Sequence, residues 1–181
     1  MKKIIIISVC VIFASTLKAQ FNYSLATSLN FYRLTTTNPV YLAPEINVNL
    51  QLGYYLSNTW GISSGAFISN RYFDIENERI TSKNIQIPLL VSKYIKIENT
   101  PFGLTSSIGY LLSVPFDSKS SLSNTYDIGL IHGGYFSIFM DNWVNENVAF
   151  FGGVNGSYDF MNKNNIKFWS YGITLGFKSF L

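Results

Sequence analysis

Apolar and polar residues alternate with a period of two along eight stretches of this sequence, and this pattern constrains the fold more than any other feature. Such alternation places apolar side chains on one face of a β-strand and polar side chains on the other. In one stretch Ile46, Val48 and Leu50 alternate with asparagines. Each stretch reaches the ~9–11 residues that a tilted membrane strand needs. The sequence therefore predicts long strands with one apolar face.

The eight predicted strands are joined alternately by shorter and longer polar segments. We expect strands at about 21–33, 44–56, 60–73, 83–97, 102–114, 126–140, 148–160 and 166–180. Periplasmic turns are predicted at 57–59, 98–100 and 141–147, and outer loops at 35–43, 74–82, 115–125 and 161–165. An even number of antiparallel strands with short periplasmic turns is typical of bacterial outer-membrane barrels. The expected fold is all-β, an eight-stranded antiparallel up-and-down transmembrane β-barrel.

The N-terminal residues have the organisation of a secretory signal peptide. Lys2 and Lys3 precede an apolar run that ends at Leu17, and Ala19 provides a small residue for cleavage. The run is too short to span a membrane as a helix. We expect residues 1–20 to be a cleaved signal peptide and residues 21–181 to form a single barrel domain. The only cysteine, Cys10, would leave with the signal.

The charge balance argues against a nucleic-acid partner. Loss of Lys2, Lys3 and Lys18 would leave 13 − 3 = 10 basic residues against 10 acidic residues. A neutral chain has no basic patch of the kind that binds nucleic acid. No cofactor motif is present either: the sequence lacks HExxH and a phosphate-binding glycine loop, so we expect no cofactor.

A soluble eight-stranded barrel is the rival fold, and the strand faces distinguish the two. A soluble barrel needs a polar, charged exterior around an apolar interior. Here only 13% of residues are charged, and the polar strand faces carry mostly Asn, Ser, Thr, Gln and Gly. Aromatic residues such as Tyr54, Trp60 and Phe102 lie near strand ends, as in the girdles of membrane barrels. These features favour a Gram-negative outer-membrane location, with outer-membrane lipid and the barrel-assembly machinery as expected partners.

Several segments also resemble a known family. Residues 84–90, which read NIQIPLL, resemble the fourth strand of the PorT-like outer-membrane β-barrel family (outer membrane protein beta-barrel domain). The segments 101–112 and 127–134 are similar to its fifth and sixth strands. The resemblance implies an integral outer-membrane protein. Two positions depart from the family pattern: Ile85 stands where an aromatic residue is usual, and Leu181 follows Phe180, where a terminal Phe is usual. One branch of the family serves a secretion system, but most members have no assigned activity, so that role does not transfer. Envelope or secretion-system proteins are candidate partners.

Four charged residues fall on the inward strand phase near the outer loops. They are Glu45, Arg71, Asp127 and Asp159. Charges inside a narrow barrel are costly unless they pair. We expect them to form a salt-bridge plug. The alternative is a gate or small-ligand site at the outer mouth.

Two further residues allow a structural and a functional interpretation. Pro88 lies in mid-strand and cannot donate a ladder hydrogen bond, so we expect a bulge that bends the wall. The alternative is a lateral weak point for a partner or lipid.

His132 is the only histidine, and Gly134 stands where an eight-stranded lipid A deacylase would have its serine. A lone histidine without a nucleophile cannot run acyl transfer, so we interpret it as a wall residue.

Three function classes remain, and the narrow interior of an eight-stranded barrel indicates which of them to expect. Eight strands enclose an interior that side chains can fill. Phe67, Leu90, Tyr135 and Phe151 fall on the inward phase, so we predict no open pore. The expected function is a structural, scaffold or partner-binding role, exercised through the outer loops or the wall. The alternatives are a narrow channel or small-ligand binder and, less favoured, a lipid-modifying envelope enzyme.

Overall fold

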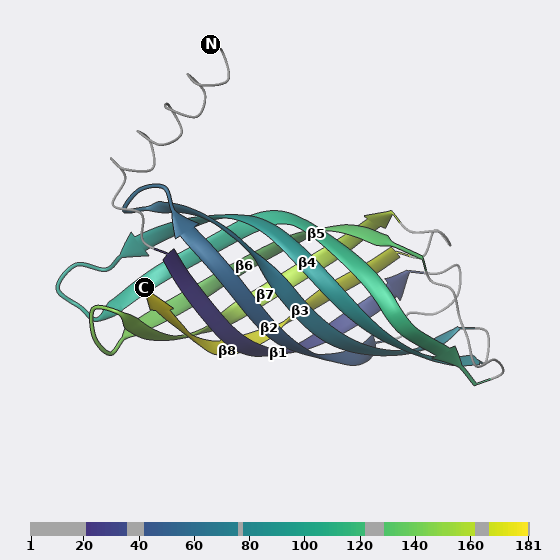
Figure 1. The fold of residues 1–181 in the computed structure, drawn as a ribbon. Coiled ribbons are helices and arrows are strands. Elements are labelled where there is room, and N and C mark those ends of the chain that lie inside the picture. Colours follow the sequence, from purple (N-terminus) through teal and green to yellow (C-terminus); the bar gives the residue numbers. More distant parts are fainter. Residues whose placement is uncertain (1–20, 36–41, 76–77, 122–128, 162–166, 181) are drawn as a thin grey trace, which may run out of the picture.

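The computed structural model describes residues 21–35, 42–75, 78–121, 129–161 and 167–180. In these residues eight antiparallel strands close into one barrel, in chain order (Figure 1). The strands are β1 (Phe21–Thr35), β2 (Leu42–Tyr55), β3 (Trp60–Ile75), β4 (Glu78–Lys96), β5 (Phe102–Ser120), β6 (Ile131–Trp143), β7 (Val148–Met161) and β8 (Lys167–Phe180). The predicted fold class is confirmed, whereas the predicted signal peptide, residues 1–20, lies outside the described residues.

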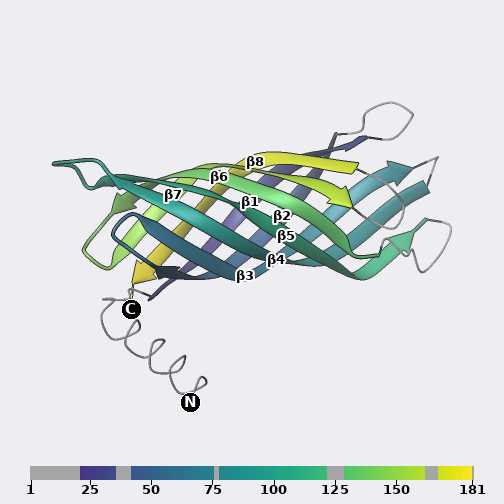
Figure 2. The same ribbon diagram turned by 90° about the horizontal axis from the view of Figure 1, so that it is seen from above.

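Strand β1 closes the barrel by pairing on both sides. Leu25 lies opposite Leu50 of β2 and opposite Phe177 of β8. In the described residues no strand edge is left open, so each strand pairs with a neighbour on both sides within the wall. The strands are tilted against the long axis of the barrel, and the start of β1 and the end of β8 lie at the same end (Figures 1 and 2).

The outer wall is apolar along the middle of every strand. Leu50, Ile62, Leu89 and Ile108 are 51%, 46%, 58% and 69% exposed. A soluble protein does not leave such a continuous apolar surface in water, whereas a barrel in lipid requires it. The predicted lipid-facing phase is therefore confirmed in four strands. The fold and this wall together place the protein in an outer membrane, as the sequence predicts.

The inward face carries small polar residues and a few bulky apolar ones. Asn47, Asn49, Ser69 and Asn84 are buried inside the barrel, and Ser63 and Ser107 are half-buried. Small side chains leave room for neighbours across the narrow lumen, so inward polar residues can bond one another. Paired residues of neighbouring strands also bond one another, as the hydroxyls of Ser157 and Ser170 do at 2.7 Å.

The outer ends of β3, β4 and β5 are longer than predicted. The expected loops 74–82 and 115–125 are wrong over most of their length, because β3 continues to Ile75, β4 begins at Glu78 and β5 continues to Ser120. We call residues 71–75, 78–83 and 115–120 the outer extension. Both faces of a strand can be polar where it leaves the lipid, so the period-two apolar signal fades there although the ladder continues. The loop segments 36–41, 122–128 and 162–166 lie outside the described residues.

Strand β6 is shifted toward the C-terminus relative to the prediction. Gly129 has a left-handed backbone with φ of 72°, and the strand begins at Ile131 rather than at 126. At its other end Asp141 pairs with Gly103 within the ladder, so the predicted turn 141–147 is too long. A charged residue there resembled a turn residue, but its carboxylate is neutralised inside the barrel by Lys178.

Pro88 interrupts the ladder between β3 and β4 without a register shift. The paired residues stop at Ser64 with Leu89 and resume at Phe67 with Gln86. Pro88 is fully buried, and its carbonyl accepts a hydrogen bond from the Ser64 hydroxyl at 2.8 Å. The predicted bulge at Pro88 is wrong. The irregularity in β4 lies instead between Lys83 and Asn84, opposite β5.

The connections at the end that holds the start of β1 and the end of β8 are short. In the β4–β5 turn, Asn99 adopts a left-handed φ of 59°, and the Thr100 hydroxyl donates to the Ile97 carbonyl at 2.9 Å. Short turns identify the periplasmic end of a bacterial barrel. In the described residues no helix is long and apolar enough to cross a membrane.

Candidate functional site

The lumen is the candidate site because the buried charges and buried bulky side chains meet there. The depth of these side chains in the lumen follows from the order of the inward residues along β3 and β4, because inward positions recur every second residue. Along β3 the order toward the outer end is Phe67, Ser69 and Arg71, and along β4 it is Leu90, Pro88 and Gln86. The charges at the outer end and the apolar residues in the middle therefore occupy separate layers.

Arg71 of β3 is held by carboxylates from two other strands. Its Nε donates to Glu45 Oε1 of β2 at 3.0 Å, and its Nη1 lies 3.4 Å from Asp159 Oδ2 of β7. All three side chains are at most 3% exposed. A buried guanidinium between two carboxylates is neutralised, and its directional donors join three separate strands. We call Glu45, Arg71 and Asp159 the outer charge cluster.

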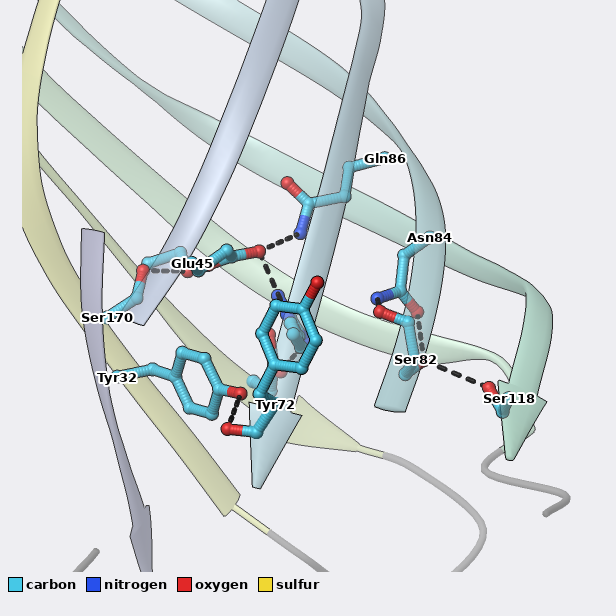
Figure 3. A network of polar contacts seen from close by, with 11 residues as sticks. Tyr32, Glu45, Tyr72, Ser82, Asn84, Gln86, Ser118 and Ser170 are labelled. Carbon is cyan, nitrogen blue, oxygen red and sulfur yellow. Dashed lines mark hydrogen bonds and ion pairs between the residues drawn. The ribbon is translucent and has the colours of Figure 1, made fainter. Parts of the chain in front are cut away.

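Polar amides and aromatic rings surround the outer charge cluster. The Gln86 amide donates to Glu45 Oε1 at 3.5 Å (Figure 3). The Arg71 guanidinium lies over the rings of Tyr32 and Phe168, at 5.9 and 5.4 Å from their centroids. Tyr32 is itself fixed, because its hydroxyl donates to the Tyr72 carbonyl at 2.7 Å (Figure 3). These contacts fill the outer part of the lumen with ordered side chains.

A second network links β4 to β5 beside the outer charge cluster. The Ser82 hydroxyl donates to Asn84 Oδ1 at 3.1 Å and lies 2.9 Å from the Ser118 hydroxyl (Figure 3). Ser82 and Asn84 are both fully buried. This network continues the interior into the outer extension, so the extension is a packed part of the barrel wall.

An apolar layer lies in the middle of the lumen. Phe67, Leu90, Leu111 and Tyr135 form one buried cluster, and the rings of Phe67 and Tyr135 lie 5.7 Å apart. The rings of Phe139 and Phe151 are also in contact, with their centroids 5.1 Å apart and their planes tilted by 40°. The four consecutive strands β3, β4, β5 and β6 contribute to the cluster, so it packs into the lumen from one half of the wall. The predicted inward position of Phe67, Leu90, Tyr135 and Phe151 is confirmed by their burial.

A second ion pair, which the strand pattern did not predict, lies at the periplasmic end. Lys178 Nζ is 2.7 Å from Asp141 Oδ2 and 3.2 Å from the Thr105 hydroxyl. The same ammonium lies 5.5 Å from the Tyr94 ring centre and 5.4 Å from that of Trp143. Lys178 falls on the inward phase of β8, and an inward lysine requires an acid. The need for an acid partner could have indicated this ion pair from the sequence, but the predicted turn 141–147 included Asp141.

A small polar cavity adjoins this periplasmic ion pair. Its volume is about 60 Å³, and its lining includes Gln51, Ser63, Ser107, Asp141 and Lys178. Asp141 Oδ1 is buried without a hydrogen-bond partner among the described residues. Polar cavities of this size hold ordered water that satisfies such atoms. The cavity has room for a few waters and is far smaller than the ~300–1,000 Å³ typical of small-molecule sites.

The structure brings together three of the four predicted lumen charges. Glu45, Arg71 and Asp159 are in contact, whereas Asp127 lies outside the described residues. His132 is half-buried at the bulge between β6 and β7, and its Nδ1 contacts the Tyr110 hydroxyl. Within the described part of the chain, no group of three or more His, Cys, Asp or Glu side chains could hold a metal ion.

Comparisons with known proteins support the fold alone. No family profile matches the sequence, and no curated protein matches it. Among solved structures, the chain is similar to OprG from Pseudomonas aeruginosa, with a TM-score of 0.59, 12% identity and coverage of 90% of this chain and 95% of that one. It is also similar to Neisserial surface protein A, with a TM-score of 0.56, 11% identity and coverage of 87% and 96%.

A third similar structure is Ail, the attachment invasion locus protein of Yersinia pestis, in complex with the heparin analogue sucrose octasulfate. Its TM-score is 0.55 at 12% identity, with coverage of 88% of this chain and 99% of that one. The fold is thus that of the eight-stranded outer-membrane β-barrels. At these identities, the likeness assigns no ligand or activity to this chain.

Proposed function

We propose that this protein is a closed outer-membrane barrel that acts as a scaffold or partner-binding surface, without an open pore or catalytic activity. The observation that carries the proposal is the layered filling of the lumen. The outer charge cluster, the apolar layer at Phe67 and Tyr135, and the periplasmic ion pair lie one behind another. A barrel filled in this way would offer solutes no continuous path, so the protein would act by binding partners at its outer surface.

The outer extension is the proposed contact surface. β4 and β5 have 19 residues each, about twice the ~9–11 that a tilted membrane strand needs. Lys83 and Lys119 flank Asp117 on the outside of this region, at 3.2 and 3.8 Å. Side chains displayed on a rigid scaffold commonly carry recognition. A PorT-like role beside envelope or secretion-system proteins belongs to the same proposal, supported by the sequence resemblance in β4 and β5.

Site-specific photocrosslinking in intact cells tests the proposal. A photoreactive residue at Lys119, whose side chain is 64% exposed, should give one discrete protein adduct. The matched control is the same residue at Leu50, which is 51% exposed but faces lipid in the middle of the wall. That position should give no protein adduct. Absence of adducts at both Lys119 and Lys83, in cells that fold the barrel, would contradict a partner-binding role of the extension.

The alternative, a narrow channel or small-ligand binder, would require the side chains inside the lumen to move. A gate at the outer mouth would have to separate Arg71 from both Glu45 and Asp159, whose contacts join three strands. Leaving one buried partner unpaired costs about 3–5 kcal/mol. That cost favours the closed scaffold over the channel.

A further inference from the structure

An apolar groove lies on the lipid-facing wall in the periplasmic half of β1–β4. Its volume is about 420 Å³, and the residues that line it include Phe21, Leu52, Ile62, Leu89 and Val91. Each of these side chains is at least 46% exposed on the outer wall. The groove is therefore open to lipid, and its floor adjoins the lumenal cavity, because Gly53 and Ser63 line both. Its size falls within the ~300–1,000 Å³ of typical ligand sites.

The groove exists because a small residue lies between bulky ones where the ladder is interrupted. Ser64 is opposite Leu52 on one side and Leu89 on the other. Pro88 has no N–H to donate toward β3, and the pairs of Gly65 and Ala66 with β4, on the outer side of Ser64, are missing. The Ser64 hydroxyl bonds the Pro88 carbonyl at 2.8 Å, so no polar group of this pair is left unsatisfied toward the lipid.

A cation lies at the periplasmic end of the groove. The outward pairs of β3 and β4 run in order from Ser64 with Leu89, through Ile62 with Val91, to Trp60 with Lys93. The Lys93 ammonium lies 5.6 Å from the centre of the Trp60 ring. Among the described residues, no carboxylate forms an ion pair with Lys93. Tryptophan marks the lipid–water boundary, so this positive charge is placed at the depth of lipid headgroups.

We propose that the groove binds one anionic glycerophospholipid of the periplasmic leaflet. One acyl chain lies in the hollow over Ser64, between Leu52 and Leu89, and the lipid phosphate contacts Lys93. The apolar lining suits a hydrocarbon chain, and the unpaired ammonium one step beyond Val91 suits an anion. Only a ligand with both an apolar chain and an anionic head satisfies the two parts at once.

Native mass spectrometry of the folded, detergent-solubilised protein with added phosphatidylglycerol tests the proposal. The wild type should retain one lipid. Ser64→Phe fills the hollow and should abolish the one-lipid adduct. Its matched control is Thr27→Phe: Thr27 is also a small hydroxyl residue on the outer wall, bonded to a backbone carbonyl of the next strand, that of Asn47, at 3.2 Å. Thr27→Phe should retain the lipid.

The charge is tested separately at the exposed position 93, where substitution leaves the hollow unchanged. Lys93→Gln should weaken the adduct about fivefold, the contribution of one lysine at a membrane surface, and Lys93→Arg should retain it. Free glycerol phosphate, which has the head without the chain, should not bind. Equal lipid retention by the wild type, Ser64→Phe and Lys93→Gln would show non-specific annular lipid only and would overturn the proposal, as would a protein bound in the groove in place of lipid.

Discussion

At the scale of single residues, the outer charge cluster is held by one guanidinium. Arg71 serves both Glu45 and Asp159 inside the barrel, and all three side chains are buried. Breaking a buried ion pair is costly because the remaining charge has lost its counter-ion and cannot reach water. The stability of the outer lumen should therefore depend on this arginine more than on any exposed ion pair.

We predict that Arg71→Met lowers the free energy of unfolding by about 3–5 kcal/mol, because two buried carboxylates lose their cation. Urea unfolding in lipid bilayers measures this loss. The control is Lys83→Met, which breaks the ion pair to Asp117 at 3.2 Å, where the lysine is 47% exposed. An exposed pair contributes only about 0–1 kcal/mol. Equal losses in the two variants would contradict a structural role for the cluster.

Two glycines of the wall should respond to alanine in opposite directions. A Cβ at Gly65 would lie 2.0 Å from the Leu50 carbonyl oxygen, so Gly65→Ala should destabilise the barrel by about 1–3 kcal/mol through overpacking. A Cβ at Gly134 would meet nothing closer than 3.9 Å. Gly134→Ala should leave stability unchanged or raise it by about 0.4–1 kcal/mol. Unfolding midpoints of both variants in the same lipid check the signs, and a stabilising Gly65→Ala would contradict the close approach.

The sequence was informative about individual residues where strand phase alone decides their direction. Phase placed Glu45, Arg71 and Asp159 inside the barrel, and the structure brings them together. It could not reveal the partner of Lys178, because Asp141 lies at a strand end where a turn was equally compatible with the sequence. It also could not predict the groove at Ser64, which depends on how Leu52 and Leu89 flank it from neighbouring strands.

At the scale of strands, the depth of each outward residue in the bilayer determines how much a charged substitution destabilises the barrel. Arginine at Leu50 or Ile108, which are 51% and 69% exposed on the mid-wall, should cost about 2–4 kcal/mol. Phe116 is 56% exposed in the outer extension, and Phe116→Arg should cost only about 0–1 kcal/mol near the interface. Urea unfolding in bilayers compares the three variants. If Leu50→Arg and Phe116→Arg cost the same, either the lipid face or the position of the extension is wrong.

The accuracy of the predicted strands followed the strength of the apolar alternation. The first residues of β1, β3, β5 and β7 were predicted correctly, because the lipid-facing pattern begins there at the periplasmic end. The outer ends of β3, β4 and β5 were not predicted, because strands that have left the lipid carry polar residues on both faces. The ladder between Ile80 and Ser120 is maintained by backbone pairing and buried contacts that no single segment of sequence displays.

At the scale of the whole molecule, the central claim is that the barrel is closed. Two groups of buried ion-paired side chains and one buried apolar cluster lie along the lumen, and eight strands enclose only enough space for side chains. Solute passage would require several layers to rearrange together. Loss of one residue should therefore weaken the barrel before it opens a path.

Conductance of the purified protein in planar lipid bilayers tests this claim most directly. The wild type should show no steady conductance, whereas a 16-stranded porin in the same bilayers, with its open aqueous channel, serves as the positive control. The double variant Phe67→Ala with Tyr135→Ala removes two rings of the apolar layer and should increase brief openings. Steady, porin-like conductance of the wild type would contradict the closed barrel and favour the channel alternative.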